Sequence, residues 1–560
     1  MHPIAAMALA FSSALFLAAC GGQDDELPTP VTKDAQAACA ALASTRIPAS
    51  AIGLPTTGAR IDRADLVPVS ATNSLGEYCL AVGRIDPVDP AAQPIGFNVA
   101  LPTAWNGKAM QLGGGAWSGF LFPANGASSY GDQPVPVARG YAVVATDGGH
   151  QGGGSDVLPD ARFAMNDELL RNFGGDHLKK AHDVALALIR IRYDAAPAKT
   201  YFMGDSGGGH QAMLVLQRWP QDYDGIIAVY PALAWTSTFM KLQMIGREMR
   251  REGGAGWINP AKSEAIRVAL LGACDAGDGL VDGNVSNPHA CRFDLDALLC
   301  PGGGDAGDAC LSAAQLRVLK AYVDPAPLSY SLAHGIRALP SFRGGEFNLA
   351  KGAFTAAFGN TAAFDPPAAG GSPRLDEIGA NHWFGDTMVR GAILQDLQAD
   401  SLAFDPLNPG VHLARLQHVS AILDATSAEI QPFLARRGKL LLVHGTADPL
   451  IPAQASIDYY RSIVQRFGQP AVDASVRFYL VPGYAHAAGI SFNATRGLPL
   501  LSALEAWVEG GTAPADNLIV TDTSSGAGNR TRPLCRYPTW PQYRGSGDPS
   551  SAASFRCAAD

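Results

Sequence analysis

The sequence lacks three features that would each point to a broad class of protein. After residue 19 it has no apolar run long enough to cross a membrane, and it has no stripe of basic residues that would suit nucleic acid. It has nine cysteines but no C-x-x-C pair, which argues against zinc. We therefore expect no nucleic-acid partner, no zinc site and no helix that spans a membrane.

The N-terminal residues have the composition of an export signal. Residues 4–19 are apolar and rich in small side chains, and Leu-Ala-Ala-Cys, the pattern of a bacterial lipobox, ends at Cys20. The first three residues carry no Lys or Arg, so a plain signal peptide is the alternative. We expect a lipoprotein signal peptide at 1–19, cleavage before Cys20, lipid on its sulfur and a tether over 20–36. The protein would then be an outer-membrane lipoprotein, held to the membrane only by this lipid, or otherwise periplasmic or secreted.

The other eight cysteines indicate disulfide bonds, because an even number in an exported chain is typical of a disulfide framework. Their clustering along the chain favours local pairs over long-range ones. The expected pairs are Cys39–Cys79, Cys274–Cys291, Cys300–Cys310 and Cys535–Cys557.

Short apolar strands alternate with helices over the first half of the chain, which predicts a parallel sheet flanked by helices. The rhythm stops near residue 232, where the sequence becomes irregular and rich in Gly and Pro, and it resumes near residue 439. We expect a core of parallel sheet and flanking helices from 37–231 and 431–560, with an inserted lid domain at 232–430. The expected strands are 96–101, 108–112, 141–146, 200–203, 224–230, 439–444 and 476–481, and the expected helices include 178–192 and 211–216.

Residues 204–208 read Gly-Asp-Ser-Gly-Gly, the G-x-S-x-G pattern of a nucleophile elbow. A strand-like run precedes this segment and a helix-like run follows it, which is the context that an elbow needs. The alternative is a glycine-rich turn in which Ser206 is incidental.

A serine nucleophile needs a base, and the base needs an acid that orients it. Asp448 and His486 follow Ser206 in the order Ser, Asp, His, and each comes just after an expected strand. Two other histidines compete for the role of base. His210 more plausibly supports the elbow, and His444 lies inside a strand and is expected to be structural.

The reaction also needs N–H groups that bind the negative oxygen of a tetrahedral intermediate. One should come from Gly207, the residue after the nucleophile. The other should come from Gly114 or Gly115, in the glycine-rich loop after the strand at 108–112. The alternative is that this loop is only flexible.

Several segments together resemble the tannase and feruloyl esterase family, which includes the mono(2-hydroxyethyl) terephthalate hydrolases. The resemblance runs from about residue 37 to the end of the chain. It implies an α/β-hydrolase core, a lid domain and hydrolysis of esters of aromatic acids. The segments that carry it are 140–150, 206–211, 220–226, 445–452, 482–486, 530–538 and 545–548.

The resemblance also implies a structural calcium ion in the lid, and no organic cofactor. Carboxylates spaced by glycines suit a hard cation that prefers oxygen ligands, although residues 274–284 alone could be an acidic turn. The implied ligands are the side chains of Asp275, Asp278 and Asp282 and the backbone carbonyls of Leu280 and Asn284.

The chain departs from this family beside its active site. Most relatives have a cysteine just before the nucleophile and another just after the catalytic histidine, and these two form a disulfide. Asp205 and Ala487 stand there instead. An ionised Asp205 would oppose the oxyanion and favour a protonated His486, and it could also replace the crosslink by accepting backbone N–H groups. The alternative is that Asp205 points away and is tolerated.

The sequence as a whole predicts an exported serine esterase that acts on small aromatic esters of the feruloyl or galloyl type. One alternative is a hydrolase of terephthalate monoesters or other small esters, and another is a non-catalytic, calcium-stabilised surface binding protein. In the lid, Trp383, Phe384 and Arg390 are candidates for an aromatic wall and a carboxylate partner. The alternative is that they form the core of the lid itself.

Overall fold

The computed structural model describes residues 34–126, 131–152, 161–348, 357–362, 375–487, 491–524 and 526–559. The expected signal peptide, the lipid site at Cys20 and most of the tether lie outside these residues. Among the described helices, none combines the length and the apolar character that crossing a membrane requires.

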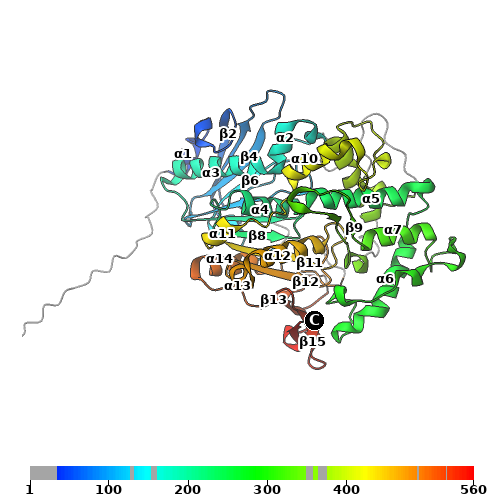
Figure 1. Ribbon diagram of the computed structural model, residues 1–560. Coiled ribbons are helices and arrows are strands. Elements are labelled where there is room, and N and C mark those ends of the chain that lie inside the picture. The colour runs from blue at the N-terminus through cyan, green and yellow to red at the C-terminus, as the bar shows by residue number, and fades with distance from the viewer. Residues whose placement is uncertain are drawn as a thin grey trace, which may run out of the picture.

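A sheet of ten strands forms the centre of the molecule (Figure 1). Strands β1 to β4 are antiparallel, and β4 also pairs antiparallel with β6. From β6 onward the neighbours are parallel, which confirms the expected α/β class. In sheet order the strands are β1 (Arg46–Ile47), β2 (Gly58–Val67), β3 (Tyr78–Asp86), β4 (Ile95–Pro102), β6 (Ala142–Thr146), β5 (Lys108–Leu112), β7 (Lys199–Asp205), β8 (Gly225–Val229), β11 (Lys439–Gly445) and β12 (Val476–Val481).

Helices cover both faces of this sheet, because successive strand residues point to opposite sides. Phe202 and Leu440 pack with α4 and α12 on one face. Their chain neighbours Tyr201 and Leu441 pack with α14 on the other. The helices of the two faces are α3 (His177–Tyr193), α4 (Gly207–Arg218), α12 (Ala453–Phe467) and α14 (Leu500–Gly510).

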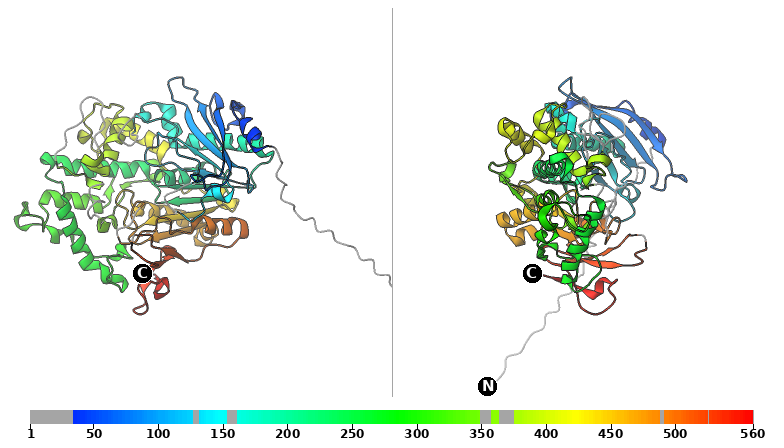
Figure 2. Two further views of the ribbon diagram at one scale, coloured as in Figure 1. Left: turned by 180° about the vertical axis from the view of Figure 1, so that it is seen from behind. Right: turned by 90° about the vertical axis from the view of Figure 1, so that its right-hand side faces the viewer.

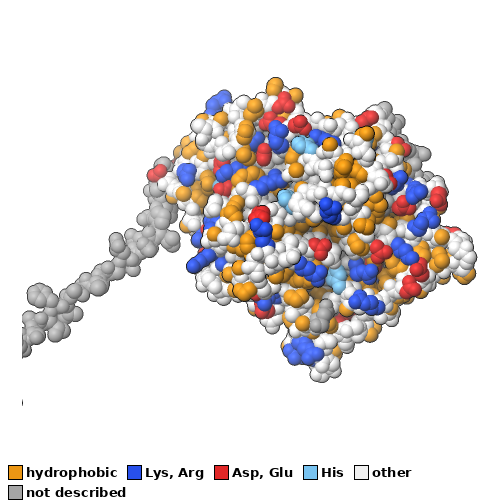
Figure 3. Space-filling model, viewed as in Figure 1, with side chains coloured by type: hydrophobic (Ala, Val, Ile, Leu, Met, Phe, Trp, Pro, Cys, Tyr) orange, Lys and Arg blue, Asp and Glu red, His pale blue; other side chains and the backbone are white. Residues whose placement is uncertain are grey.

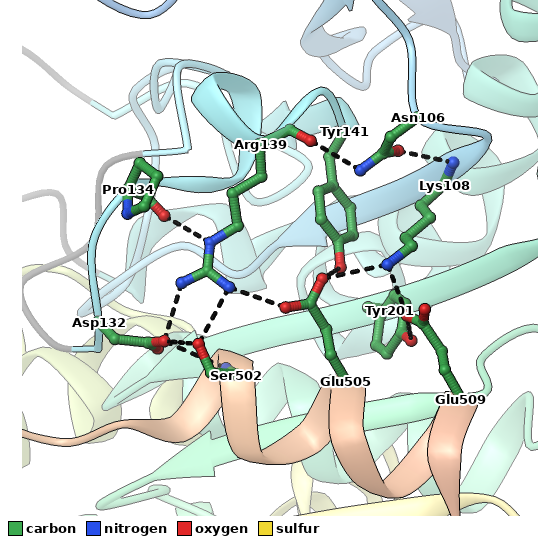
Figure 4. A network of polar contacts seen from close by, with 10 residues as sticks. All are labelled: Asn106, Lys108, Asp132, Pro134, Arg139, Tyr141, Tyr201, Ser502, Glu505 and Glu509. Atoms are coloured by element: carbon green, nitrogen blue, oxygen red, sulfur yellow. Dashed lines mark hydrogen bonds and ion pairs between the residues drawn. The ribbon is translucent and has the colours of Figure 1, made fainter.

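Polar contacts fix α14 to its face of the sheet (Figure 4). Glu505 and Glu509, one turn apart, both pair with Lys108 on β5. The hydroxyl of Tyr141 donates to Glu505, and that of Tyr201 donates to Glu509. Each carboxylate at this partly buried interface therefore has a charged and a neutral partner, which offsets its desolvation.

The inserted segment, residues 232–430, stands at one end of the sheet in the left view of Figure 2, in green and yellow. It is more helical than the sequence indicated. Its longest helix, α5, buries Lys241, Gln243 and Arg250, so polar residues do not mark a solvent face there. The elements of this segment are α5 (Trp235–Gly254), α6 (Pro260–Cys274), α7 (Ala313–Val323), β9 (Ala326–Pro327), β10 (Ala338–Leu339), α9 (Leu375–Thr387) and α10 (Leu413–Leu423).

Four disulfides join the eight cysteines in the four local pairs expected from their spacing. Cys39–Cys79 ties the first helix to β3, two others lie in the inserted segment, and Cys535–Cys557 closes the C-terminal tail. The remaining elements are α1 (Ala35–Ala40), α2 (Asp167–Arg171), α11 (Gln431–Ala435), α13 (Gln469–Asp473), β13 (Asn517–Thr521), β14 (Thr531–Cys535), β15 (Trp540–Tyr543) and β16 (Phe555–Ala558).

Charges of both signs are mixed over the face of the molecule drawn in Figure 3. Blue and red side chains alternate there, with hydrophobic side chains between them. A protein that binds nucleic acid usually gathers its Lys and Arg residues on one face or along one helix. On the face shown, the distribution agrees with the absence of a basic stripe from the sequence.

Burial in the interior keeps four of the described histidines neutral. Burial lowers the pKa of His177 and of His444 to about 4, and that of His210 and of His382 to about 3. An unfolded chain binds protons at these side chains from about pH 6.5 downward, whereas the folded chain does not. Each of them therefore removes stability as the pH falls from about 6.5 toward its folded pKa.

We predict that His210→Gln reduces the loss of stability that acid causes. Between about pH 6.5 and 4, the neutral His210 should cost about 1.4 kcal/mol of unfolding free energy per pH unit, and glutamine removes this cost. The measurement is urea unfolding of both proteins across this range. Buried carboxyl groups with raised pKa values are common to both proteins, so the difference isolates His210. Parallel stability curves would contradict the prediction.

Candidate active site

The elbow at residues 204–208 forms as the sequence predicted. β7 ends at Asp205 and α4 begins at Gly207, so Ser206 lies alone in the turn. Its backbone has φ 57° and ψ −119°, a strained conformation for a residue with a side chain. A Cβ on Gly204 would lie 2.1 Å from the carbonyl oxygen of Gly208, so the turn requires glycine there.

Ser206, His486 and Asp448 form one chain of hydrogen bonds. The Nε2 atom of His486 lies 2.8 Å from the Ser206 hydroxyl, and its Nδ1 atom lies 2.8 Å from Asp448 Oδ2. The other carboxylate oxygen of Asp448 accepts the backbone N–H groups of Leu450 and Ile451, at 2.9 and 3.0 Å. The carboxylate is therefore fixed by its own loop, and it fixes the imidazole in turn.

Charge within this chain favours a protonated imidazole facing an ionised carboxylate. Burial alone would raise the pKa of Asp448, but the charge of His486 and its hydrogen bond outweigh burial and lower it. Burial alone would lower the pKa of His486, whereas the charge of Asp448, its hydrogen bond and the charge of Asp205 together raise it. Both shifts stabilise the ion pair that forms when His486 takes a proton.

The two rival histidines have other partners. His210 is fully buried, and its Nε2 atom lies 2.5 Å from the carbonyl oxygen of Leu423 at the end of α10. His444 lies between Ser456 and the carbonyl oxygen of Ile451, and its Nε2 atom is 3.8 Å from Asp448. His210 thus links the elbow helix to the inserted segment, and His444 supports the loop that carries Asp448.

The glycine-rich loop after β5 packs directly on the elbow. A Cβ on Gly207 would lie 2.7 Å from the carbonyl oxygen of Ala116, and one on Gly113 would lie 2.6 Å from the Cα of Gly208. The N–H of Gly114 already donates to the side-chain oxygen of Gln211, at 2.8 Å. Of the two candidate donors in this loop, the structure therefore favours Gly115.

The candidate substrate residues of the inserted segment are buried or, in the case of Phe384, partly buried. Trp383 is fully buried, and Phe384 stacks on Phe239 with ring centroids 5.1 Å apart. Arg390 pairs with Asp386 one turn earlier on the chain. These contacts agree with the alternative that the residues form a core, and their contact with substrate stays a prediction.

Two aromatic residues beside the glycine-rich loop did not enter the sequence analysis. Phe120 and Phe122 lie with their ring centroids 4.4 Å apart, and Phe120 is 45% exposed. The Phe122 ring would touch a Cβ placed on Gly114 or Gly115, at 3.2 and 3.5 Å. Their closeness in sequence to this loop was the signal that could have identified them.

The proposed calcium loop has oxygen donors of the right kind. The carboxylates of Asp275 and Asp282 both accept the N–H of Asn284, and the side-chain oxygen of Asn284 is buried without a hydrogen bond. Asp282 also pairs with Arg532 of β14, at 2.8 Å. Within the described parts of the chain, no three acidic, His or Cys side chains are grouped to hold a metal. Calcium therefore stays a prediction.

The comparisons with known proteins agree with the resemblance seen in the sequence. A family model described as tannase and feruloyl esterase matches residues 79–558. An uncharacterized esterase of Agrobacterium fabrum is 37% identical over 541 residues, covering 94% of each chain. The mono(2-hydroxyethyl) terephthalate hydrolase of Piscinibacter sakaiensis is 30% identical over 545 residues, covering 88% of this chain and 87% of that protein.

The fold is also found in solved structures. The crystal structure of feruloyl esterase B from Aspergillus oryzae has a TM-score of 0.74 at 21% sequence identity, covering 93% of this chain and 100% of that chain. At this identity the likeness establishes the fold alone, and membership follows from the family model and the sequence relatives. The chain belongs to the tannase and feruloyl esterase family and is a carboxylic ester hydrolase.

Proposed function

We propose that this protein is an exported serine esterase that hydrolyses small esters of aromatic acids through Ser206, His486 and Asp448. The observation that carries the proposal is the unbroken chain of hydrogen bonds from the Ser206 hydroxyl through His486 to Asp448. A non-catalytic binding protein would have no use for a strained serine held against an imidazole.

In the proposed mechanism, His486 takes the hydroxyl proton of Ser206 through Nε2 while the serine oxygen attacks the ester carbonyl. Asp448 stabilises the resulting imidazolium through Nδ1 and holds the ring in the required tautomer. The imidazolium then gives the proton to the leaving alcohol, which frees it and leaves an acyl-enzyme. A water molecule repeats the same steps on the acyl-enzyme and releases the acid.

The negative oxygen of the tetrahedral intermediate would be held by the backbone N–H groups of Gly207 and Gly115. This assignment is supported by the packing of the glycine-rich loop on the elbow and by the engagement of Gly114 with Gln211. Such fixed donors act on charge that develops in the transition state, so they need no reorganisation.

The aromatic substrate class rests on two observations. Relatives are named feruloyl esterases and a terephthalate monoester hydrolase, and those names concern esters of aromatic acids. The half-exposed pair Phe120 and Phe122 lies against the loop of the proposed oxyanion hole, where it could stack on an aromatic acyl group. Hydrolysis rates on methyl ferulate, methyl gallate, chlorogenic acid and a terephthalate monoester would show whether the enzyme prefers feruloyl and galloyl esters or terephthalate monoesters.

Export and lipid attachment at Cys20 belong to the same proposal. Support comes from the signal-like N-terminus and from the four disulfides, since such bonds persist in oxidising compartments. The lipid would keep the catalytic part of the chain at the membrane surface, on a tether of residues 20–36.

Ser206→Ala should lower kcat for p-nitrophenyl acetate by a factor on the order of 10⁶, because the nucleophile is lost. The matched control is Ser462→Ala, which removes a hydroxyl from α12 that donates to the carbonyl oxygen of Tyr459. The control should keep wild-type kcat. Near-normal activity of the Ser206 variant would exclude the proposed mechanism.

Phe122→Leu should raise KM for methyl ferulate by roughly two- to tenfold, since a lost aromatic stack costs about 0.5–1.5 kcal/mol. The KM for p-nitrophenyl acetate should change little, because acetate has no ring to stack. The matched control is Phe467→Leu on α12, where the phenylalanine is also half-buried. Equal changes for the two esters would show that Phe122 does not recognise the acyl ring.

We further propose that the loop of Asp275, Asp278 and Asp282 binds a structural calcium ion, with the backbone carbonyls of Leu280 and Asn284. Removal of calcium by EGTA should lower Tm, and added calcium should restore it, because a bound ligand stabilises only the folded state. Asp278→Asn should lower the calcium-dependent part of Tm. An unchanged Tm of the wild-type protein in EGTA would exclude the site.

A further inference from the structure

Two residues that contact His486, and the residue that follows it, have a strained backbone. Besides Ser206 at φ 57°, Tyr230 has φ 33° and Ala487 has φ 58°. A positive φ is unfavourable for a bulky residue such as tyrosine, and such strain persists only where surrounding contacts hold it. Contacts around Tyr230 must therefore hold its backbone in this conformation.

Tyr230 follows β8 and precedes Pro231, at the sheet edge that carries the nucleophile. Its N–H donates to the carbonyl oxygen of Val443, at 2.7 Å, and its side chain is fully buried. The strained turn places its ring against the imidazole of His486, with ring centroids 4.7 Å apart and planes inclined by 54°. The tyrosine ring therefore supports the imidazole from the side of β8.

Asp205 holds the other end of this tyrosine. The Tyr230 hydroxyl donates to Asp205 Oδ2, at 2.8 Å. Asp205 is the last residue of β7 and directly precedes Ser206. The end of β7 therefore does two things. It places Ser206 against Nε2 of His486, and through Asp205 it fixes the Tyr230 ring that contacts the imidazole.

We propose that Asp205 and Tyr230 are positioning residues for the esterase reaction, which together hold the imidazole of His486 in line with Ser206. This inference rests on the proposed function. The carboxylate supplies an acceptor that fixes the tyrosine, and the tyrosine ring limits rotation of the imidazole out of the hydrogen-bond chain. Small misplacements of a catalytic group lower the rate strongly, so this support acts on kcat rather than on substrate binding.

Asp205 also adds negative charge near the base. The groups near His486 are Asp448 and His444 from the β11 side, Asp205 from β7 and Tyr230 from β8. Tyr484, from the loop of His486, packs against Tyr230. His444 stays neutral near pH 7, and burial raises the pKa of Tyr484, so that phenol also stays neutral. Asp205 is therefore the second anion that stabilises the protonated imidazole, after Asp448.

Two substitutions separate geometry from charge. Asp205→Asn keeps an oxygen that accepts from Tyr230 but removes the charge, whereas Tyr230→Phe keeps the ring and the charge but removes the hydrogen bond. The matched control is Tyr223→Phe, because Tyr223 is also buried and its hydroxyl donates to a side-chain oxygen, that of Gln111, at 2.6 Å. Melting temperatures of the variants check that each one folds.

The experiment is the pH dependence of kcat and KM for p-nitrophenyl acetate between about pH 5 and 9. Tyr230→Phe should lower the plateau kcat roughly tenfold with KM unchanged. Asp205→Asn should move the acid limb of kcat/KM roughly half a unit to lower pH, because His486 then loses its proton more easily. Tyr223→Phe should change neither the plateau kcat nor the position of the acid limb of kcat/KM.

The inference is overturned if Tyr230→Phe and Tyr223→Phe have the same kcat, or if the acid limb of Asp205→Asn stays in place. Labelling of the wild-type protein by a serine-directed phosphonate is measured in parallel. Stoichiometric labelling with loss of activity would support the esterase mechanism whatever the Tyr230 variants show. Absence of labelling would overturn both the mechanism and the positioning pair.

Discussion

The active site depends on four parallel strands that end at the same edge of the sheet. Asp205 pairs with Val229, Val229 pairs with Val443, and Gly445 pairs with Val481, so β7, β8, β11 and β12 stop within a few residues of one another. The chain then needs one residue beyond β7 to reach Ser206 and only short loops to reach Asp448 and His486. Hydrogen bonds of 2.8 Å between these side chains are a consequence of that alignment.

Strand and loop patterns in the sequence predicted this part well. The strands at 108–112 and 476–481 were found with the boundaries that the structure has, and the elbow lies between a strand and a helix as expected. Parallel strands buried on both faces are continuous apolar runs, so they stand out from their surroundings. The long antiparallel strands β2 and β3 were not predicted, because Arg60, Asp62 and Arg84 interrupt their apolar pattern with exposed ion pairs.

Contacts between distant segments could not be predicted in the same way. Nothing in the sequence around Tyr230 indicates that its hydroxyl meets Asp205, because that contact depends on a strained turn after β8. The helices of the inserted segment were missed because they bury polar side chains as well as apolar ones. The interior position of Arg390 likewise depends on Asp386, a partner that only the folded helix brings within reach.

The disulfides crosslink the inserted segment and the sheet-bearing core separately. None of the four links the inserted segment to the sheet, since each pair lies wholly on one side of the boundaries near residues 232 and 430. The two parts are joined by the chain itself and by contacts such as His210 with the carbonyl of Leu423 and Tyr322 with that of Pro449. The inserted segment therefore has its own disulfides, Cys274–Cys291 and Cys300–Cys310. Exchange of this segment between relatives would therefore break no disulfide of the catalytic core.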